Sequence, residues 1–367
     1  MAPHGAAPDD DRMSRHRVVA EDLARIAAAD LAWERLAGRT VLVTGASGLL
    51  GGACVETLLY SNEVRARDGQ HGTAPTRVVA LSRDAGRLAE RFSAYAGRAD
   101  LELVAHDVAL PWQPSGALDF VIHAASPATP RAFGSDPIGT YQPNVLGTHR
   151  LLELAHAKEA LGFLFVSSGA VYGAVAGPGP ITESSLGSVD PLDLKSCYAE
   201  SKRMGEAMCA AWHHQRGLPT RIARVGHTYG PHMRRSDDRA FAEFVFCVVD
   251  GRDILLNSDG QARRMFSYVS DTTEGLLRVL LDGRNGEAYT VANPAAESSI
   301  LDLARLVTTL YPERGSTVRV NAAPRPAGYL PNTDAGPTVD ISKMRALGWR
   351  PTIDLAAGFR RTIASYL

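Results

Sequence analysis

The chain has 367 residues, of which 45% are hydrophobic and 22% are charged, so it can bury the core of one large domain or two small ones. Its 39 Lys and Arg residues nearly balance its 40 Asp and Glu residues, and a net charge of −1 gives no reason to expect nucleic-acid or membrane-surface binding. The four cysteines lack metal-ligand spacing and disulfide density, and no signal peptide or membrane span is recognisable, so we expect a cytoplasmic protein without a metal site.

The N-terminal residues divide into two parts. Residues 1–14 are rich in Pro, Ala, Gly and Asp and carry little apolar surface, which predicts a disordered leader. In residues 15–37, apolar side chains recur at helical spacing from Val18 to Leu36. We therefore expect an amphipathic helix that packs on the domain after it.

Short apolar segments then alternate with helical segments. The segments that read as buried strands are residues 40–43, 78–81, 101–104, 120–122 and 163–166. This alternation predicts an α/β fold with a Rossmann-type, doubly wound parallel sheet. We expect a cofactor-binding domain in residues 38–227 and a smaller, mainly substrate-binding domain in residues 228–367, with some exchange of chain between the two.

A glycine-rich turn, residues 44–51 (TGASGLLG), follows the first predicted strand and opens a helix. Glycines allow a tight turn and close backbone approach, and a helix N-terminus attracts a pyrophosphate, so the context predicts a dinucleotide site. An ordinary strand-to-helix turn is the alternative. The candidate cofactor-binding residues here are Gly45, Ser47, Gly48, Leu49, Leu50 and Gly51.

The next two strand ends bear on the kind of dinucleotide. Ser82 and Arg83 end the second strand, where Arg83 could pair with the 2′-phosphate of NADP or stack on the adenine of NAD. Asp107 and Val108 follow the third strand and are placed to meet the adenine, although Asp107 could instead be a helix cap or turn residue. We expect NAD, with NADP as the alternative.

Tyr198 and Lys202 are four residues apart in a predicted helix. They therefore share one helix face, and the ammonium can favour the ionised form of the phenol. A phenol tuned in this way can remove a proton from an alcohol near neutral pH.

Taken in order, these motifs resemble the extended short-chain dehydrogenase/reductase family that modifies nucleotide sugars. The glycine turn, the segment 123–126 (HAAS), the strand-end segment 167–173 (SSGAVYG) and the Tyr198/Lys202 pair match its pattern. The resemblance implies a catalytic set of Tyr198, Lys202 and Ser168. It also implies cofactor contacts from Tyr198, Lys202, Ala124, Ala125, Ser126, Asn144, Ser167 and Val225.

Within this family, residues 123–137, 196–203, 228–231 and 264–269 are most similar to the UDP-glucuronate decarboxylase branch. That resemblance places Arg239 and Arg264 on the nucleotide diphosphate, which suits guanidinium chemistry; a surface salt bridge is the alternative for each. The substrate contacts that it implies are Pro127, Ser168, His227, Arg239, Arg264 and Tyr268.

Four places in the sequence depart from the family pattern. The decarboxylases and dehydratases carry a Glu at the position of Ala170, and the dehydratases an Asp at the position of Gly169. His227 replaces a substrate-binding Asn and is either a substitute acid or base or a different substrate contact. Pro337-Thr338-Val339 stands where the decarboxylases often carry an arginine pair.

The resemblance implies an enzyme that acts through a transient 4-keto sugar with bound NAD. Because epimerisation at C4 needs no extra acid, a UDP-sugar 4-epimerase is our leading expectation. The alternatives are a UDP-glucuronate decarboxylase or sugar dehydratase, an NADPH-dependent 4-ketosugar reductase, and a non-catalytic nucleotide-sugar sensor. The resemblance also implies a homodimer.

Overall fold

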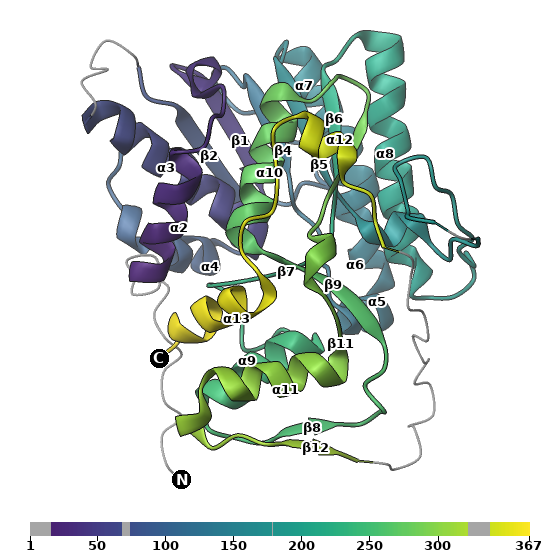
Figure 1. The fold of residues 1–367 in the computed structure, drawn as a ribbon. Coiled ribbons are helices and arrows are strands. Elements are labelled where there is room, and N and C mark those ends of the chain that lie inside the picture. Colours follow the sequence, from purple (N-terminus) through teal and green to yellow (C-terminus); the bar gives the residue numbers. More distant parts are fainter. Residues whose placement is uncertain (1–15, 68–73, 178, 322–337) are drawn as a thin grey trace.

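The computed structural model describes residues 16–67, 74–177, 179–321 and 338–367 (Figure 1). The predicted leader and Pro337 lie outside these residues. Within the part described, none of the helices is both long and apolar enough to cross a membrane, and Cys54, Cys197, Cys209 and Cys247 are free thiols.

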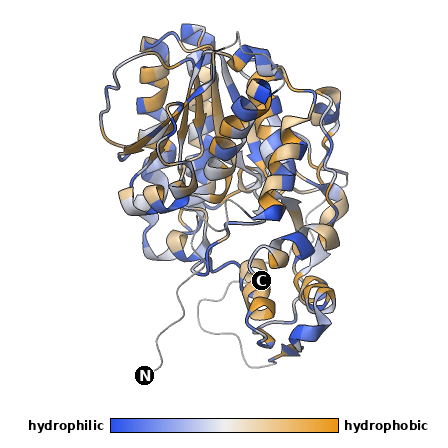
Figure 2. Cartoon of the chain, turned by 90° about the vertical axis from the view of Figure 1, so that its left-hand side faces the viewer, coloured by the Kyte–Doolittle hydropathy of each residue, from blue (hydrophilic) through white to orange (hydrophobic). Residues whose placement is uncertain are grey.

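A seven-stranded parallel sheet forms the centre of the larger lobe, in the order β10-β6-β5-β4-β1-β2-β3. Its strands are β1 (Thr40–Thr44), β2 (Arg77–Ser82), β3 (Leu101–Ala105), β4 (Phe120–His123), β5 (Gly162–Ser168), β6 (Thr220–Val225) and β10 (Ala288–Val291). The first five include all five strands predicted from the sequence. The strands are apolar because both faces of the sheet are buried, and they are mostly orange in Figure 2.

Helices cover both faces of this sheet, which confirms the doubly wound architecture. One face packs against α3 (Leu49–Arg67), α10 (Val269–Asp282) and α12 (Ser342–Ala346). The other packs against α7 (Thr148–Ala157) and α8 (Ser196–Arg216). Shorter helices lie between strands: α4 (Ala85–Arg91), η2 (Ser93–Tyr95), α5 (Pro130–Ser135), α6 (Pro137–Gln142), the π-helix η3 (Pro143–Gly147) and η4 (Gly169–Tyr172).

The smaller lobe has its own apolar core, seen below the large sheet in Figure 1. Its helices are α9 (Ala240–Val249), α11 (Ile300–Leu310), η5 (Pro294–Ala296), η6 (Pro312–Arg314) and α13 (Leu355–Ala364). Its strands are β7 (His227–Tyr229), β8 (Ile254–Leu256), β9 (Arg263–Tyr268), β11 (Glu297–Ser299) and β12 (Val318–Val320). Since β10 is a strand of the large sheet and α10 and α12 pack against it, the chain passes between the lobes more than once.

The N-terminal extension is helical over a shorter range than the spacing predicts. Helix α2 (Arg17–Ala27) ends before Leu31, and a 3-10 turn, η1 (Trp33–Leu36), follows. Leu31 and Leu36 are both buried in the core beside the sheet. The bend after Ala27 brings these two side chains into that core, which a straight helix would not do.

Helix α2 is fastened to both lobes by buried polar contacts. Asp22 accepts hydrogen bonds from Tyr268 Oη at 2.7 Å and from Arg361 Nη2 at 2.9 Å. Arg25 forms an ion pair with Asp271 of α10 at 2.9 Å. Because Tyr268 and Arg361 lie on β9 and α13, one carboxylate of the extension joins three elements.

We predict that Asp22→Ala lowers the free energy of unfolding by about 2–4 kcal/mol, because it takes the acceptor from the buried Tyr268 hydroxyl and one of two carboxylate partners from the partly buried Arg361 guanidinium. Urea denaturation of the full chain measures this. Arg17→Ala, on the same helix but 89% exposed, is the control and should change stability by less than about 0.5 kcal/mol. Equal effects of the two substitutions would contradict the role of Asp22.

Candidate active site

The carboxyl ends of the parallel strands meet at one edge of the sheet, and the glycine turn leaves β1 there. Gly45 has φ +68°, and a Cβ atom on it would come within 2.6 Å of the Ala124 carbonyl oxygen. A side chain is therefore excluded, and the turn packs directly against the end of β4. Helix α3 begins at Leu49, immediately after the turn, so its N-terminus faces the same edge.

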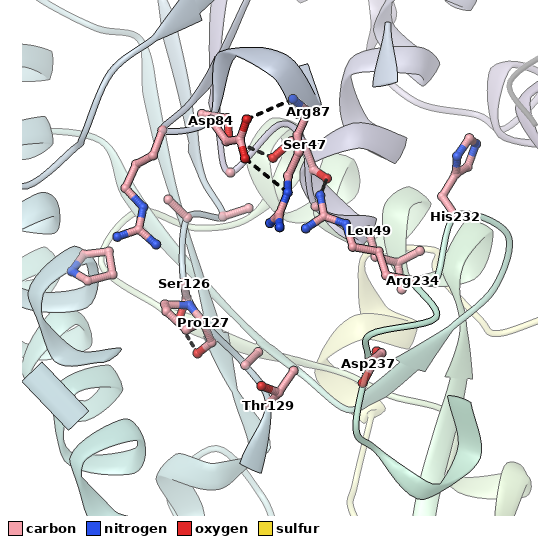
Figure 3. Close-up of a pocket in the computed structure, with 18 of the residues that line it drawn as sticks. Ser47, Leu49, Asp84, Arg87, Ser126, Pro127, Thr129, His232, Arg234 and Asp237 are labelled. Atoms are coloured by element: carbon pink, nitrogen blue, oxygen red, sulfur yellow. Dashed lines mark hydrogen bonds and ion pairs between the residues drawn. The ribbon is translucent and has the colours of Figure 1, made fainter. Parts of the chain in front are cut away.

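A cavity of about 460 Å³ opens at this edge, between the glycine turn and the segment that follows β7 (Figure 3). The predicted cofactor residues that line it are Gly45, Ser47, Gly48, Leu49, Ser82, Arg83, Val108, Ala124, Ala125 and Ser126. Pro127 and Arg239, predicted to bind substrate, also line it. The cavity thus has the wall that a dinucleotide requires: glycine backbone, a helix N-terminus and arginines.

Other predicted cofactor residues lie behind this wall. Leu50 packs into the core and Gly51 is buried. Asp107 accepts a hydrogen bond from Ala109 N at 2.9 Å, as expected if it is a turn residue. Asn144 is fully buried and donates to Ser201 Oγ at 3.0 Å. It therefore braces α8, and its role as a direct cofactor contact stays a prediction.

Tyr198 and Ser168 lie together at the carboxyl end of β5, two strands along the sheet from β1. The Tyr198 ring stacks on Phe133 of α5, with centroids 4.6 Å apart and planes at 17°. Burial raises the pKa of Tyr198, while a hydrogen bond from Ser168 and the charge of Arg239 act to lower it. In this arrangement Ser168 is the group that favours the phenolate most.

Lys202 lies one helical turn after Tyr198 and is only 3% exposed. Its Nζ donates to the Val166 carbonyl at 2.7 Å and lies 5.9 Å from the centroid of the Tyr198 ring. Desolvation lowers the pKa of Lys202 to about 7, and the charge of Glu206 opposes this. The ammonium is therefore close to its titration point at neutral pH, which the sequence pattern does not reveal.

Glu206 stands one further turn along the same face of α8. Its carboxylate accepts from Ser167 Oγ at 2.5 Å and pairs with Arg224 of β6 at 2.7 Å. The Ser167 hydroxyl is thus held by Glu206 and does not point into the cavity, and its cofactor role stays a prediction. This buried carboxylate fixes the rotation of α8 against β5 and β6.

A second cavity, of about 490 Å³, lies between β9 and α9 of the smaller lobe. It brings together three predicted substrate residues, His227, Arg239 and Arg264, with Phe241 and Phe266. Arg239 also forms an ion pair with Asp237, with Nε 2.9 Å from the carboxylate. Arg239 therefore forms a salt bridge, which was the alternative to its predicted diphosphate contact, and it also lines the cavity.

His227 lines this cavity and a smaller one beside it, of about 220 Å³, which Gly169 and Val225 also line. Desolvation and the charges of Arg264 and Arg239 lower the pKa of His227 to about 4, so the imidazole is neutral at pH 7. The ring is nevertheless accessible from both cavities.

Tyr268 occupies a different place from the one predicted. It is 1% exposed, and its hydroxyl donates to Asp22 of the N-terminal helix. Among the described residues that line the cavities, Tyr268 does not occur. Its position at the junction of β9, α2 and α13 makes it a brace between the lobes rather than part of the substrate wall.

Three features of the site were not predicted from the sequence. Phe133 covers Tyr198, Glu206 sits behind Lys202, and Arg234 reaches the glycine turn from the smaller lobe. The four-residue spacing from Lys202 to Glu206 could have indicated a shared helix face. The other two contacts join segments far apart in the chain and depend on the tertiary fold.

Comparisons with known proteins show the family of this chain. The model of the NAD dependent epimerase/dehydratase family matches residues 41–293. UDP-glucuronic acid decarboxylase 6 of Arabidopsis thaliana is 32% identical over 87% of this chain and 86% of that protein. UDP-glucuronic acid decarboxylase 1 of Xenopus tropicalis is 31% identical over 89% of this chain and 71% of that protein.

Solved structures share the fold over nearly the whole chain. A dTDP-glucose 4,6-dehydratase from Streptomyces venezuelae with NAD bound is 26% identical, with a TM-score of 0.71 over 89% of this chain and 96% of that one. A UDP-glucuronic acid 4-epimerase from Bacillus cereus is 22% identical, also with a TM-score of 0.71, over 89% and 98%. The second likeness is one of fold alone.

We predict that Glu206→Gln lowers the pKa of Lys202 by roughly 1, because it removes the negative charge that favours the ammonium. Lys202 then loses its charge at a lower pH than in the unchanged protein. The chain has four lysines, Lys158, Lys195, Lys202 and Lys343, so a ¹³C NMR titration of labelled lysine side chains can follow each one.

Glu200→Gln is the matched control for this titration, since Glu200 lies on the same helix but is 40% exposed and pairs with Arg203. It should leave the Lys202 titration unchanged. The same result for Glu206→Gln would show that Glu206 does not support the ammonium.

Proposed function

This chain belongs to the NAD dependent epimerase/dehydratase family, and on that premise we propose that it is an NAD-dependent enzyme that modifies nucleotide sugars through a transient 4-keto sugar. The observation that supports this proposal is that Ser168 hydrogen-bonds Tyr198 and that Lys202 Nζ lies 5.9 Å from the centroid of the Tyr198 ring. The cavity beside the glycine turn fits the dinucleotide, and the one with Arg239 and Arg264 fits a nucleotide diphosphate.

The residues divide the first step between them. Bound NAD would supply the acceptor and later the donor of a hydride. Tyr198 takes the proton of the sugar's C4 hydroxyl, and Ser168 hydrogen-bonds the same oxygen. The Lys202 ammonium favours the phenolate that this transfer requires, and Phe133 covers the ring and limits its contact with water. The product of this step is a 4-keto sugar.

Epimerisation at C4 is the net reaction that we propose. It requires the keto sugar to turn and to receive hydride on its other face, with Tyr198 returning the proton. Ala170 supports this choice: its N–H donates to Ser168 Oγ at 3.2 Å, so it adjoins the catalytic hydroxyl, and its methyl group cannot transfer a proton. No acid beyond Tyr198 is needed for this reaction.

UDP-glucuronate decarboxylation is the second candidate, and the 31–32% identical relatives favour it. A 4-keto group makes the C6 carboxylate labile, so carbon dioxide can leave without an acid at position 170. The carbanion formed at C5 must then be protonated. Water would supply this proton; His227 lines the adjoining cavity and could orient that water, but its ring is neutral at pH 7 and has no imidazolium proton to give.

Two further alternatives are weaker. An NADPH-dependent ketoreductase would use Arg83 on a 2′-phosphate; Arg83 lies 3.9 Å from Asp107 and is 60% exposed. A non-catalytic sensor would not need the Tyr198, Ser168 and Lys202 cluster.

The UDP moiety, the cytoplasmic location and the homodimer also stay predictions. Exposed apolar side chains on α6, η3 and α8 (Ile138, Tyr141, Leu146 and Met204) would be covered in such a dimer.

Purified protein incubated with UDP-glucuronate, UDP-glucose and UDP-galactose should convert one of them to its C4 epimer without change of mass. Mass spectrometry and ¹H NMR of the products measure this, and HPLC after denaturation identifies the released dinucleotide. We expect NAD. Loss of the mass of carbon dioxide would replace epimerisation by decarboxylation, and released NADP with net reduction would support the reductase.

Tyr198→Phe should lower kcat by about 10³-fold, because it removes the proton acceptor. NAD binding should remain within about twofold of the unchanged protein, since the ring and its stacking on Phe133 are kept. Steady-state kinetics and calorimetric titration with NAD⁺ measure the two effects. Turnover that survives in this variant would remove Tyr198 from the mechanism.

A further inference from the structure

We propose that Arg234, which belongs to the smaller lobe, completes the binding site for the diphosphate of the dinucleotide and retains the cofactor between turnovers. This inference rests on the proposed function, since it requires a bound dinucleotide. It concerns the segment 231–239, which joins β7 to α9 and which we call the strap.

The first observation is a contact between distant parts of the chain. Arg234 Nη2 donates to the Ser47 carbonyl oxygen at 2.5 Å, across 187 residues of sequence. Ser47 lies within the glycine turn, and both residues line the cavity of about 460 Å³. Figure 3 shows the Arg234 side chain extending from the strap toward Ser47 and Leu49. A guanidinium is therefore positioned at the turn where a dinucleotide's pyrophosphate binds.

The chemistry of the guanidinium suits that place. Its N–H donors form a planar fork that matches phosphate oxygens, and it remains charged at all physiological pH values. The other arginines on the β2 side of the cavity, Arg83 and Arg87, belong to the segment after β2, where the adenosine ribose is expected. Arg234 instead lies at the glycine turn, so we infer that it contacts the diphosphate of the dinucleotide and not the adenosine ribose.

A second contact fastens the strap to the larger lobe. His232 Nε2 lies 3.0 Å from Arg91 Nη1, and Arg91 forms a bidentate pair with Glu56 at 2.8 and 2.7 Å. The Arg91 and Glu56 side chains are only 3% and 2% exposed. The strap is thus held by a buried cluster from α3 and α4 as well as by the glycine turn.

The backbone of the strap is held in an uncommon conformation at this cluster. His232 has φ +68°, which residues other than glycine seldom adopt, and such strain persists where surrounding contacts enforce it. The adjoining Met233 is buried, and its carbonyl accepts from Tyr366 Oη at 2.6 Å. These contacts fix where Arg234 begins and hence where its guanidinium can reach.

The consequence is a cofactor enclosed from two lobes. A dinucleotide bound here would be held from both lobes, so its dissociation should be slower with the Arg234 contact than without it. An epimerisation restores its cofactor in every cycle and has no need to exchange it. The strap therefore supplies the retention that the proposed reaction uses.

The test compares Arg234→Ala with Arg235→Ala. Arg235 is the next residue, but it pairs with Asp250 at 3.0 Å and lies over Phe246, away from the cavity wall. Calorimetry with NAD⁺, ADP and adenosine as probes should show that Arg234→Ala weakens NAD⁺ and ADP about tenfold or more and leaves adenosine unchanged. Arg235→Ala should match the unchanged protein for all three. Arg234→Lys, which keeps the charge but not the fork, should lie between them.

Release of bound NAD⁺ into a dinucleotide-free buffer should also be at least tenfold faster for Arg234→Ala than for Arg235→Ala. Equal affinities and release rates in the two variants would overturn the role of Arg234. Equal weakening of ADP and adenosine would overturn it as well, because the defect would not concern phosphate. If the unchanged protein does not bind NAD⁺, the proposed function fails too; if it binds and only the Arg234 effect is missing, the proposed function stands.

Discussion

The burial of one ammonium group organises the centre of this molecule. Lys202 is enclosed between α8 and β5, where water cannot solvate its charge, and it is held by the Val166 carbonyl, the face of Phe165 and the charge of Glu206. Gly205 allows α8 to pack this closely against β5, because any side chain at this position would overlap the Phe165 ring. Once α8 is fixed in this rotation, Tyr198 and Ser168 meet at the sheet edge, and the remaining parts of the site are arranged around them.

Much of this arrangement follows from local patterns. Apolar runs set the strands, the glycine turn requires backbone space at Gly45, and the spacing of Tyr198 and Lys202 sets their common face. The sequence does not show how deeply these side chains are buried. Their spacing suggests that the Lys202 ammonium and the Tyr198 phenolate stabilise each other, but burial raises the pKa of Tyr198 and lowers that of Lys202. Tyr268 shows the same limit, since its motif matches a substrate wall while the N-terminal helix holds its hydroxyl.

The two lobes are connected by polar contacts that are buried rather than superficial. Asp22 gathers Tyr268 and Arg361, and the Arg91 and Glu56 pair receives His232. Buried polar groups are costly unless each finds a partner, so these clusters favour one relative position of the lobes over others that would leave charges unpaired. Such preorganisation matters for the proposed function, because the cavity at the glycine turn is lined by both lobes while the one with Arg239 and Arg264 lies mainly on the smaller lobe.

The exposed position of Ala170 on the turn after β5 has a consequence for how the site can change over generations. No packed core and no hydrogen-bonded side chain depends on this methyl group, so a larger residue meets little resistance from the fold. Alanine and glutamate codons that end in the same purine differ by one base. A lineage built on this scaffold is therefore a single nucleotide substitution away from gaining or losing a carboxylate beside Ser168, with Tyr198 and Lys202 left in place.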